Sequence, residues 1–234
     1  MKRRLAFLLM AVLLAAAKPA QAAETFSART AQEARIKALA VFDIAALSME
    51  YPGENAQQGH LIRWENSIRI HVDGRPTDQD RKTLDTLLLN LALRVPTLPN
   101  ITLTSDPAAA NMHVYFVPLS QMKNYVPGYV ENSWGMFHYT YQNWRITEAW
   151  IGIASDVTSQ KDRNHLIQEE IIGALGLLND HSIYSDSIVY QLWTVVQQPS
   201  EVDWLMLNMV YSPLVSPGME KEELHRIFLD AWAR

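Results

Sequence analysis

Residues 168–180 read QEEIIGALGLLND and place two carboxylates, Glu169 and Glu170, side by side in an apolar stretch. A helix that holds zinc for hydrolysis carries two histidines four residues apart, and the glutamate after the first histidine deprotonates the metal-bound water. Glu170 stands at the position of that glutamate, whereas the two histidine positions hold Glu169 and Gly173. The sequence therefore predicts Glu170 as the candidate catalytic residue of a site that lacks its usual metal ligands.

The residues that follow keep one further part of the metzincin motif, in which a glycine comes three residues after the second histidine and a third histidine six residues after it. Gly176 fills the glycine position within the segment ALGL, and Asn179 replaces the third histidine. The stretch thus resembles the active-site helix of a metzincin. The resemblance implies an α+β fold, with a mixed sheet that has an antiparallel edge strand and is backed by helices in a single domain. It also implies that a substrate backbone pairs with that edge strand.

Further segments resemble the secreted bacterial family known as the domain of unknown function number 2927, over residues 63–232. The matching segments are Glu169-Glu170, Ala174 to Leu177, Asn179-Asp180, Leu207 to Pro213 and Pro217 to Met219. This resemblance implies a secreted, zincin-like domain without an established activity, and it supplies no substrate.

An unusual set of ligands could still hold zinc. His165 and Glu169 are four residues apart and share a helix face, and Asp180 or His181 could approach from beyond Gly176. Such a pair also arises by chance, and a histidine near a helix start is commonly solvated. We therefore expect no cofactor, and zinc held by His165, Glu169 and His181 is the alternative.

Asn179 and Asp180 follow the leucines at the end of the predicted helix. Asn tolerates the left-handed backbone conformation and Asp accepts backbone hydrogen bonds in turns, so the pair is typical of a helix stop. The alternative is a polar network between Asp180 and Glu170 that contributes to binding. Both residues are kept as candidates for a binding site.

Aromatic residues are dense between positions 125 and 150, where eight of them occur. On an edge strand and its loops they could form a platform for a peptide added as an extra strand, or for sugar rings. The alternative is that aromatic residues favour strands and half of them face the core. The candidates for ligand binding are Trp134, Tyr139, Tyr141 and Trp144.

Gly173 and Gly176 each lower helix stability by roughly 1 kcal/mol relative to alanine, so we expect a packing reason for them. The expected reason is the close approach of another backbone, namely the loop from Ser182 to Gln191 closing over the former active site. The alternative is a cleft that admits a ligand.

The amino terminus has the three parts of a secretory signal peptide: a basic start, an apolar run from Leu5 to Ala17 and an Ala20-Gln21-Ala22 cleavage site. Removing residues 1–22 takes away four positive charges and changes the formal net charge from −5 to −9. An acidic chain is a poor partner for nucleic acid. Thirteen apolar residues are too few for a transmembrane anchor, which needs roughly 20. We expect a periplasmic or secreted protein, and without cysteine its stability depends on an apolar core.

Hydrophobic periodicity predicts the order of the elements. After the signal peptide, residues 23–55 form an amino-terminal arm with a helix from Thr30 to Ser48, and residues 56–234 form the zincin-like domain. The predicted strands are Ile68 to Val72, Ile101 to Thr104, Met112 to Val117, Met136 to Tyr141 and Ile146 to Ala154. The predicted helices follow Thr77 and span Asp162 to Leu178, Val202 to Tyr211 and Glu220 to Ala231.

These observations lead to one expectation of function and two alternatives. The expected protein is non-catalytic and binds a peptide, a protein or a cell-wall ligand of the envelope through a retained cleft and edge strand. The first alternative is a secreted metallopeptidase that uses Glu170 with an atypical metal site. The second is a structural component of the envelope.

Overall fold

The computed structural model describes residues 24–49 and 59–233. Its centre is a five-stranded sheet in the order β2-β1-β3-β5-β4. Four strands run parallel, and β4 pairs antiparallel with β5 at the edge of the sheet. The strands are β1 (Ile68–Gly74), β2 (Ile101–Leu103), β3 (Met112–Val117), β4 (Gly135–Gln142) and β5 (Arg145–Ala154). The mixed α+β sheet with an antiparallel edge strand, predicted from the sequence, is confirmed.

Five α-helices are described: α1 (Ala31–Leu47), α2 (Asp78–Arg94), α3 (Gln160–Ala174), α4 (Glu201–Val210) and α5 (Lys221–Trp232). Thr77 begins α2 with the predicted capping box, because its side chain accepts from Asp80 N while the Asp80 side chain accepts from Thr77 N. Short 3₁₀ helices, η1 (Pro107–Ala109) and η2 (Leu119–Asn124), flank β3. None of the helices that the structure describes is long and apolar enough to span a membrane.

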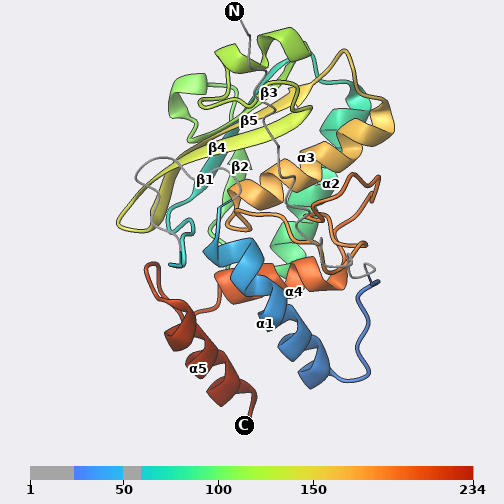
Figure 1. Ribbon diagram of the computed structural model, residues 1–234. Coiled ribbons are helices and arrows are strands. Elements are labelled where there is room, and N and C mark those ends of the chain that lie inside the picture. The colour runs from blue at the N-terminus through green and yellow to red at the C-terminus, as the bar shows by residue number, and fades with distance from the viewer. Residues whose placement is uncertain (1–23, 50–58, 234) are drawn as a thin grey trace, which may run out of the picture.

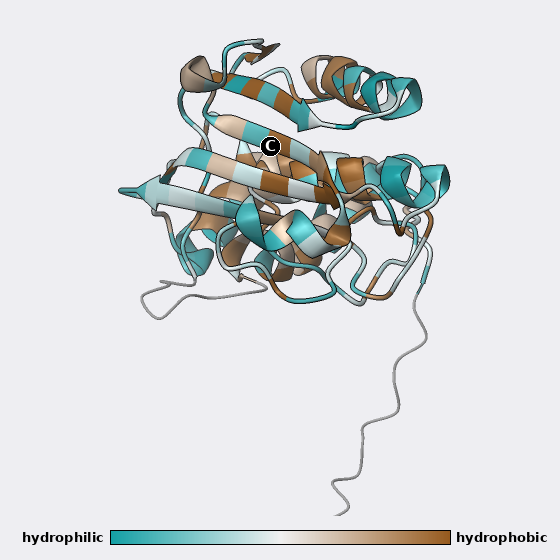
Figure 2. Ribbon diagram, turned by 90° about the horizontal axis from the view of Figure 1, so that it is seen from above, coloured by the Kyte–Doolittle hydropathy of each residue, from teal (hydrophilic) through white to brown (hydrophobic). Residues whose placement is uncertain are grey.

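The helices lie in two groups (Figure 1). Helices α2 and α3 pack side by side, and α3 contacts β4 and β5. Helices α1, α4 and α5 pack together beyond one end of the sheet. Figure 2 shows apolar and polar residues alternating along strands of the sheet, and β1 begins with buried Ile68, exposed Arg69 and buried Ile70. Because α3 contacts β4 and β4 is the edge strand, a site can form between this helix and this strand.

Helix α1 lies in the apolar core. Its buried residues include Val41, Phe42 and Ala45, none of which exposes any surface, and the Phe42 ring packs edge-on against Phe228 of α5. The boundary expected at residue 55 lies outside the described residues. The predicted signal peptide, residues 1–22, lies outside them as well. Within the described chain, α1 packs as part of the same core as the sheet.

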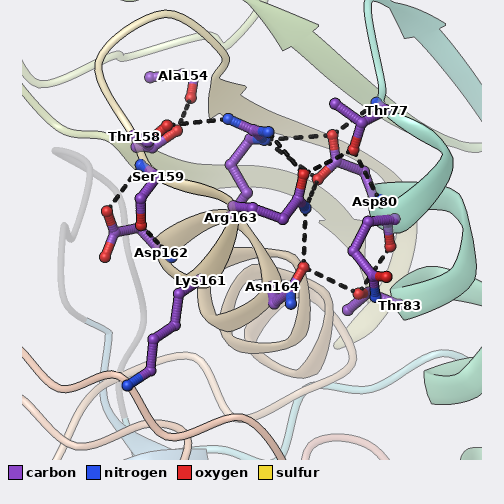
Figure 3. Close-up of polar contacts among 12 residues, drawn as sticks. Thr77, Asp80, Thr83, Ala154, Thr158, Ser159, Lys161, Asp162, Arg163 and Asn164 are labelled. Atoms are coloured by element: carbon purple, nitrogen blue, oxygen red, sulfur yellow. Dashed lines mark hydrogen bonds and ion pairs between the residues drawn. The ribbon is translucent and has the colours of Figure 1, made fainter.

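A buried ion pair fixes α3 against α2 (Figure 3). Arg163 Nε lies 3.1 Å from Asp80 Oδ1, and both residues are buried. Arg163 also donates to the Thr158 carbonyl at 2.9 Å and to Gln160 Oε1 at 2.8 Å. Gln160 in turn donates to Asp80 at 2.6 Å. The first turns of the two helices are therefore joined through satisfied charges, which sets the position of α3 beside the sheet.

A cleft between helix α3 and edge strand β4

A cleft of about 1370 Å³ runs along β4, between that strand and α3. Its volume exceeds the roughly 300–1,000 Å³ of ordinary ligand pockets. Most of the candidate residues from the sequence line it: Trp134, Tyr139, Tyr141, Glu169, Glu170, Asn179 and Asp180. Three candidates, Trp144, His165 and His181, are not among the described residues that line it.

The end of α3 differs from the prediction, which placed it at Leu178. The helix ends at Ala174, and Gly176 adopts a left-handed φ of +123°. Leu177 N then donates to the Ile172 carbonyl and Gly176 N to the Gly173 carbonyl, which is the hydrogen-bond pattern of a Schellman motif. The predicted turn at Gly176 thus stops the helix, and Leu177 is buried after the turn.

Buried side chains hold this helix end in place. Trp64 Nε1 donates to the Ala174 carbonyl at 2.9 Å, and the Tyr211 hydroxyl donates to the Leu175 carbonyl at 2.6 Å. Asn179 joins the turn to α1, because its Nδ2 donates to Ser48 Oγ at 2.7 Å and its N–H donates to the Ala45 carbonyl. Asn179 therefore lines the cleft with a side chain that is already used to dock α1.

Glu170 lies in the cleft wall with only 8% of its surface exposed. A side chain at Gly135 would overlap Glu170 Oε1 and Leu166 Cδ2, so the glutamate occupies the space above the first residue of β4. The absence of a side chain at Gly135 is what allows the carboxylate to approach the edge strand this closely. Glu170 is thus placed at the contact between α3 and β4.

Gly173 meets a different neighbour from the one predicted. A side chain at this position would overlap the ring of Phe137 in β4, whereas the predicted contact was the loop from Ser182 to Gln191. The sequence could not identify the neighbour, because which strand faces the helix depends on the order of strands in the sheet. Gly173 lines the cleft as well, so close packing and an open cleft occur at the same residue.

Aromatic rings form a row along β4 on the side that faces α3. The ring centroids of Phe137 and Tyr139 are 6.1 Å apart, as are those of Tyr139 and Tyr141. Burial raises the pKa of Tyr139 well above its usual value, so its phenol is neutral. Trp144 ends the row, 6.0 Å from Tyr141, but it lies in the turn to β5. The three rings of β4 give the cleft an aromatic wall.

Trp144 does not line the cleft, and its side chain packs against other residues instead. Its φ of +64° follows that of Asn143 at +50°, which is the backbone of a tight hairpin turn. The centroids of the Trp144 indole and the His60 ring are 4.1 Å apart. A side chain at Gly218 would overlap the indole. These contacts hold the carboxyl-terminal segment against the β4–β5 hairpin.

The outer edge of β4 is open within the part of the chain that the structure describes, because β4 is the last strand of the sheet. Ala154 N donates to the Trp134 carbonyl at 2.8 Å, which fixes the hydrogen-bonding phase of the β4–β5 ladder. By alternation along an antiparallel pair, Met136 and His138 bond to β5. The backbone groups of Gly135, Phe137 and Tyr139 therefore point away from β5, toward the open edge.

His165 and Glu169 form a pair on α3. His165 Nδ1 lies 2.9 Å from the Val196 carbonyl, which can only accept, so this nitrogen carries a hydrogen. His165 Nε2 then faces Glu169 Oε2 at 3.5 Å. Burial alone would lower the pKa of His165, but the Glu169 carboxylate, the Val196 carbonyl and the charge of Asp180 together raise it. The pair thus favours an imidazolium beside a carboxylate.

The three alternative metal ligands do not gather into one site. The described residues contain no group of three or more His, Asp or Glu side chains placed to hold a metal ion. His181 lies between the rings of Tyr184 and Tyr190, and its Nδ1 accepts from Ile183 N at 3.2 Å. These residues therefore do not fit a zinc site, because no third ligand lies beside the pair on α3 among the residues that the structure describes.

Sequence reasoning missed Trp193, Phe137 and Met49 as residues of the cleft. Trp193 lies in the long segment between α3 and α4, where no periodic pattern indicates which side chains face a site. Its ring packs edge-on against Trp134 at 5.4 Å and against His165 at 5.9 Å. The one signal available was its type, since a large aromatic side chain in a segment without periodicity is a candidate for a contact.

Two solved structures are similar to the chain at low identity. The first, titled "Structure of Myroilysin", is 13% identical, with a TM-score of 0.40 over 64% of this chain and 82% of that chain. The second, titled "Crystal structure of myroilysin", is 14% identical, with a TM-score of 0.32 over 68% of this chain and 60% of that chain. None of the curated proteins compared with the chain matches it.

The sequence profile of one family, described as "Protein of unknown function (DUF2927)", matches residues 37–230. The matched range runs from the middle of α1 to the last turns of α5 and includes every strand and both walls of the cleft. This chain therefore belongs to the DUF2927 family of proteins of unknown function.

Proposed function

We propose that this protein acts outside the cytoplasm and binds an extended peptide, or an extended segment of a protein, in the cleft beside β4 without cleaving it. The observation that carries the proposal is the coincidence of three features along one strand. No strand of the described chain pairs with the outer edge of β4, the side chains of β4 form an aromatic row, and a cleft of about 1370 Å³ lies beside both. A peptide that adds to a sheet edge uses main-chain hydrogen bonds for affinity and alternate side chains for specificity.

The length of the open edge sets the size of the ligand. From Gly135 to Tyr139 the strand rises about 14 Å at 3.4 Å per residue, which corresponds to about five peptide residues. Alternate side chains of such a peptide would face the rings of Phe137 and Tyr139. A hexapeptide with blocked ends is therefore long enough to span this edge.

Two observations support binding without cleavage. The histidine positions of the zinc-protease motif hold Glu169 and Gly173, and no group of three metal ligands is placed together among the described residues. Gly173 is also packed against Phe137, so a histidine could not replace it unless the Phe137 ring moved. Glu170 on this proposal is a structural residue of the cleft wall.

The predicted export signal supports a location in the periplasm or outside the cell.

The test uses mature protein and a pool of N-acetylated, C-amidated hexapeptides with apolar and polar residues at random positions. Equilibrium dialysis followed by mass spectrometry reports both retention and cleavage of each peptide. We expect retention of intact peptides, reduced in Trp134→Ala and unchanged in Trp144→Ala, because only Trp134 lines the cleft. A peptide pool that the wild-type protein does not retain refutes the proposal, and retention of cell-wall glycan alone moves the ligand to that class.

A second experiment distinguishes strand addition from side-chain binding. The best retained peptide is remade with single N-methyl groups, each of which removes one backbone donor. Pairing with the β4 edge predicts loss of affinity at every second amide only. Cleaved products that disappear in Glu170→Gln protein would instead favour the metallopeptidase alternative.

A further inference from the structure

One end of the cleft is formed by two indoles and a carboxylate, those of Trp134, Trp193 and Glu169. The two indoles meet edge to face, with centroids 5.4 Å apart and planes at 81°. Both are open to solvent, with 39% of Trp134 and 55% of Trp193 exposed. Large aromatic side chains exposed together inside a cleft are suited to contact a ligand.

Glu169 lies next to this pair of indoles. Its carboxylate is 3.5 Å from His165 Nε2, and the His165 ring packs edge-on against Trp193 at 5.9 Å. The imidazole is buried and bonded to the Val196 carbonyl, so it fixes the Glu169 carboxylate from behind. About one fifth of the Glu169 side chain, 19%, is exposed. The carboxylate is therefore both held in place and accessible from the cleft.

The ionisable side chains of the cleft wall are mainly acidic. The described residues that line it include three carboxylates and one histidine, His138, but no lysine or arginine. Burial lowers the pKa of His138, which keeps this ring neutral at pH 7. The lining thus carries no cationic side chain of its own among the described residues. A ligand that brings a positive charge gains from this wall, and one that brings a negative charge is repelled.

We infer that the end of the cleft formed by Trp134, Trp193 and Glu169 binds the basic side chain, lysine or arginine, of the extended peptide. This inference rests on the proposed function and names the chemistry of its ligand. The faces of the two indoles attract a cation through their quadrupoles, and Glu169 accepts a charge-assisted hydrogen bond from it. The row of rings at Phe137, Tyr139 and Tyr141 then contacts apolar parts of the same peptide.

The positions along β4 set the order of the two contacts. Gly135 lies against Glu170 and Leu166, and Phe137 lies against Gly173, so strand and helix run in the same direction through the cleft. The end of the cleft that holds Glu169 is therefore beside the first residues of β4. The aromatic row extends from this end toward Tyr141. The ligand has its basic residue at one end and its apolar residues toward the other.

Two pools of N-acetylated, C-amidated hexapeptides test the inference. They share randomised apolar residues and differ at one position, which holds lysine in the first pool and Nε-acetyllysine in the second. Acetylation removes the charge and keeps most of the side chain. We expect wild-type mature protein to retain the lysine pool about tenfold better, with a preference that declines as salt is added. Glu169→Gln protein should retain both pools within about twofold, since it keeps the shape of the side chain without its charge.

Glu148→Gln is the matched control, because Glu148 is a partly exposed carboxylate on β5 that does not line the cleft. It should keep the tenfold preference. Trp193→Ala should lose retention of the lysine pool several-fold and change the acetyllysine pool less. Equal retention of both pools by the wild-type protein overturns this inference and leaves peptide binding intact. Retention of neither pool overturns peptide binding itself, and the wild-type comparison is valid even if a variant fails to fold.

Discussion

The ring of Phe137 occupies the space that a side chain at Gly173 would need. The Phe137 ring of the edge strand therefore contacts the backbone of α3 directly at this point. The relationship matters because the same two residues line the cleft, so the width of the cleft is set by the contact of a ring with a helix backbone. A change at either residue alters both the stability of the fold and the shape of the site.

Gly173→Ala should destabilise the protein. Alanine favours helix by up to about 1 kcal/mol relative to glycine, but overpacking against a ring costs typically 1–3 kcal/mol. We expect a net loss of about 1 kcal/mol or more in urea unfolding. In a Phe137→Leu background the loss should shrink, because leucine has no ring atoms at that place, and a double-mutant cycle measures the difference. If Gly173→Ala alone, without Phe137→Leu, stabilises the protein, the Phe137 ring and its strand yield to the methyl group.

The sequence predicts most elements because each has a local signal. The strands alternate, and the capping box of Thr77 and Asp80 defines where α2 begins. The end of α3 is predicted four residues too late, because Leu177 and Leu178 continue the apolar pattern of the helix. Both leucines are buried after the turn at Gly176, so a helix and a buried turn produce the same pattern.

The site is predictable only in part, and the reason is again physical. Glu170, Tyr139 and Tyr141 lie in elements whose periodicity orients their side chains, and all three line the cleft. Trp193 and the partner of Gly173 depend on contacts between segments that are far apart in the chain. Trp144 was a candidate by type, but its contacts with His60 and Gly218 become visible only in three dimensions.

The ion pair between Asp80 and Arg163 should be the most sensitive polar contact to mutation. Asp80→Ala leaves the buried Arg163 guanidinium without its counter-charge and removes one half of the capping box, so we expect a loss of about 3–5 kcal/mol. The double variant Asp80→Leu, Arg163→Met should lose less than the sum of the single variants, because neither charge is then left alone. Chemical unfolding measures all of them.

The control for this prediction is the exposed pair of Arg94 and Glu201, whose side chains are 43% and 58% exposed. Glu201→Gln should cost less than about 1 kcal/mol, because water screens exposed ion pairs. Equal losses at the buried and the exposed pair would contradict the role assigned to Asp80 and Arg163.

His181 and Asp203 should give the protein opposite responses to pH. Burial lowers the pKa of His181 to about 4, so the unfolded chain binds the proton first and stability falls as the pH drops from about 6.5 to 4. Burial raises the pKa of Asp203 to about 6, although its hydrogen bonds from Ser187, Ile188 and Ser200 act in the other direction. Its contribution is present at low pH and is lost as the pH rises from about 4 to 6. Each effect amounts to about 3 kcal/mol, so the two largely cancel.

Single variants separate the two effects. Between pH 4 and 6, His181→Phe protein should become more stable as the pH falls, since only the Asp203 effect remains. Asp203→Asn protein should become less stable over the same range. Urea unfolding at several pH values reports the slopes, which are compared within each variant so that the direct cost of the substitution does not matter. Parallel slopes in the two variants would show that one of these groups does not titrate as described.

His165 should titrate above its unfolded value of about 6.5. Its Nδ1 hydrogen is fixed by the Val196 carbonyl, so protonation occurs at Nε2, beside the Glu169 carboxylate. The raised pKa means that its contribution to stability is present below about pH 6.5 and is lost as the pH rises through the folded pKa. In Glu169→Gln protein the burial of the ring is no longer offset by that carboxylate, and the pKa should fall. Nitrogen-15 NMR of the ring measures both the pKa and the tautomer, with His165→Gln protein to assign the signal. An Nε2 hydrogen on the neutral ring, or a pKa unchanged by Glu169→Gln, would contradict this account of the pair.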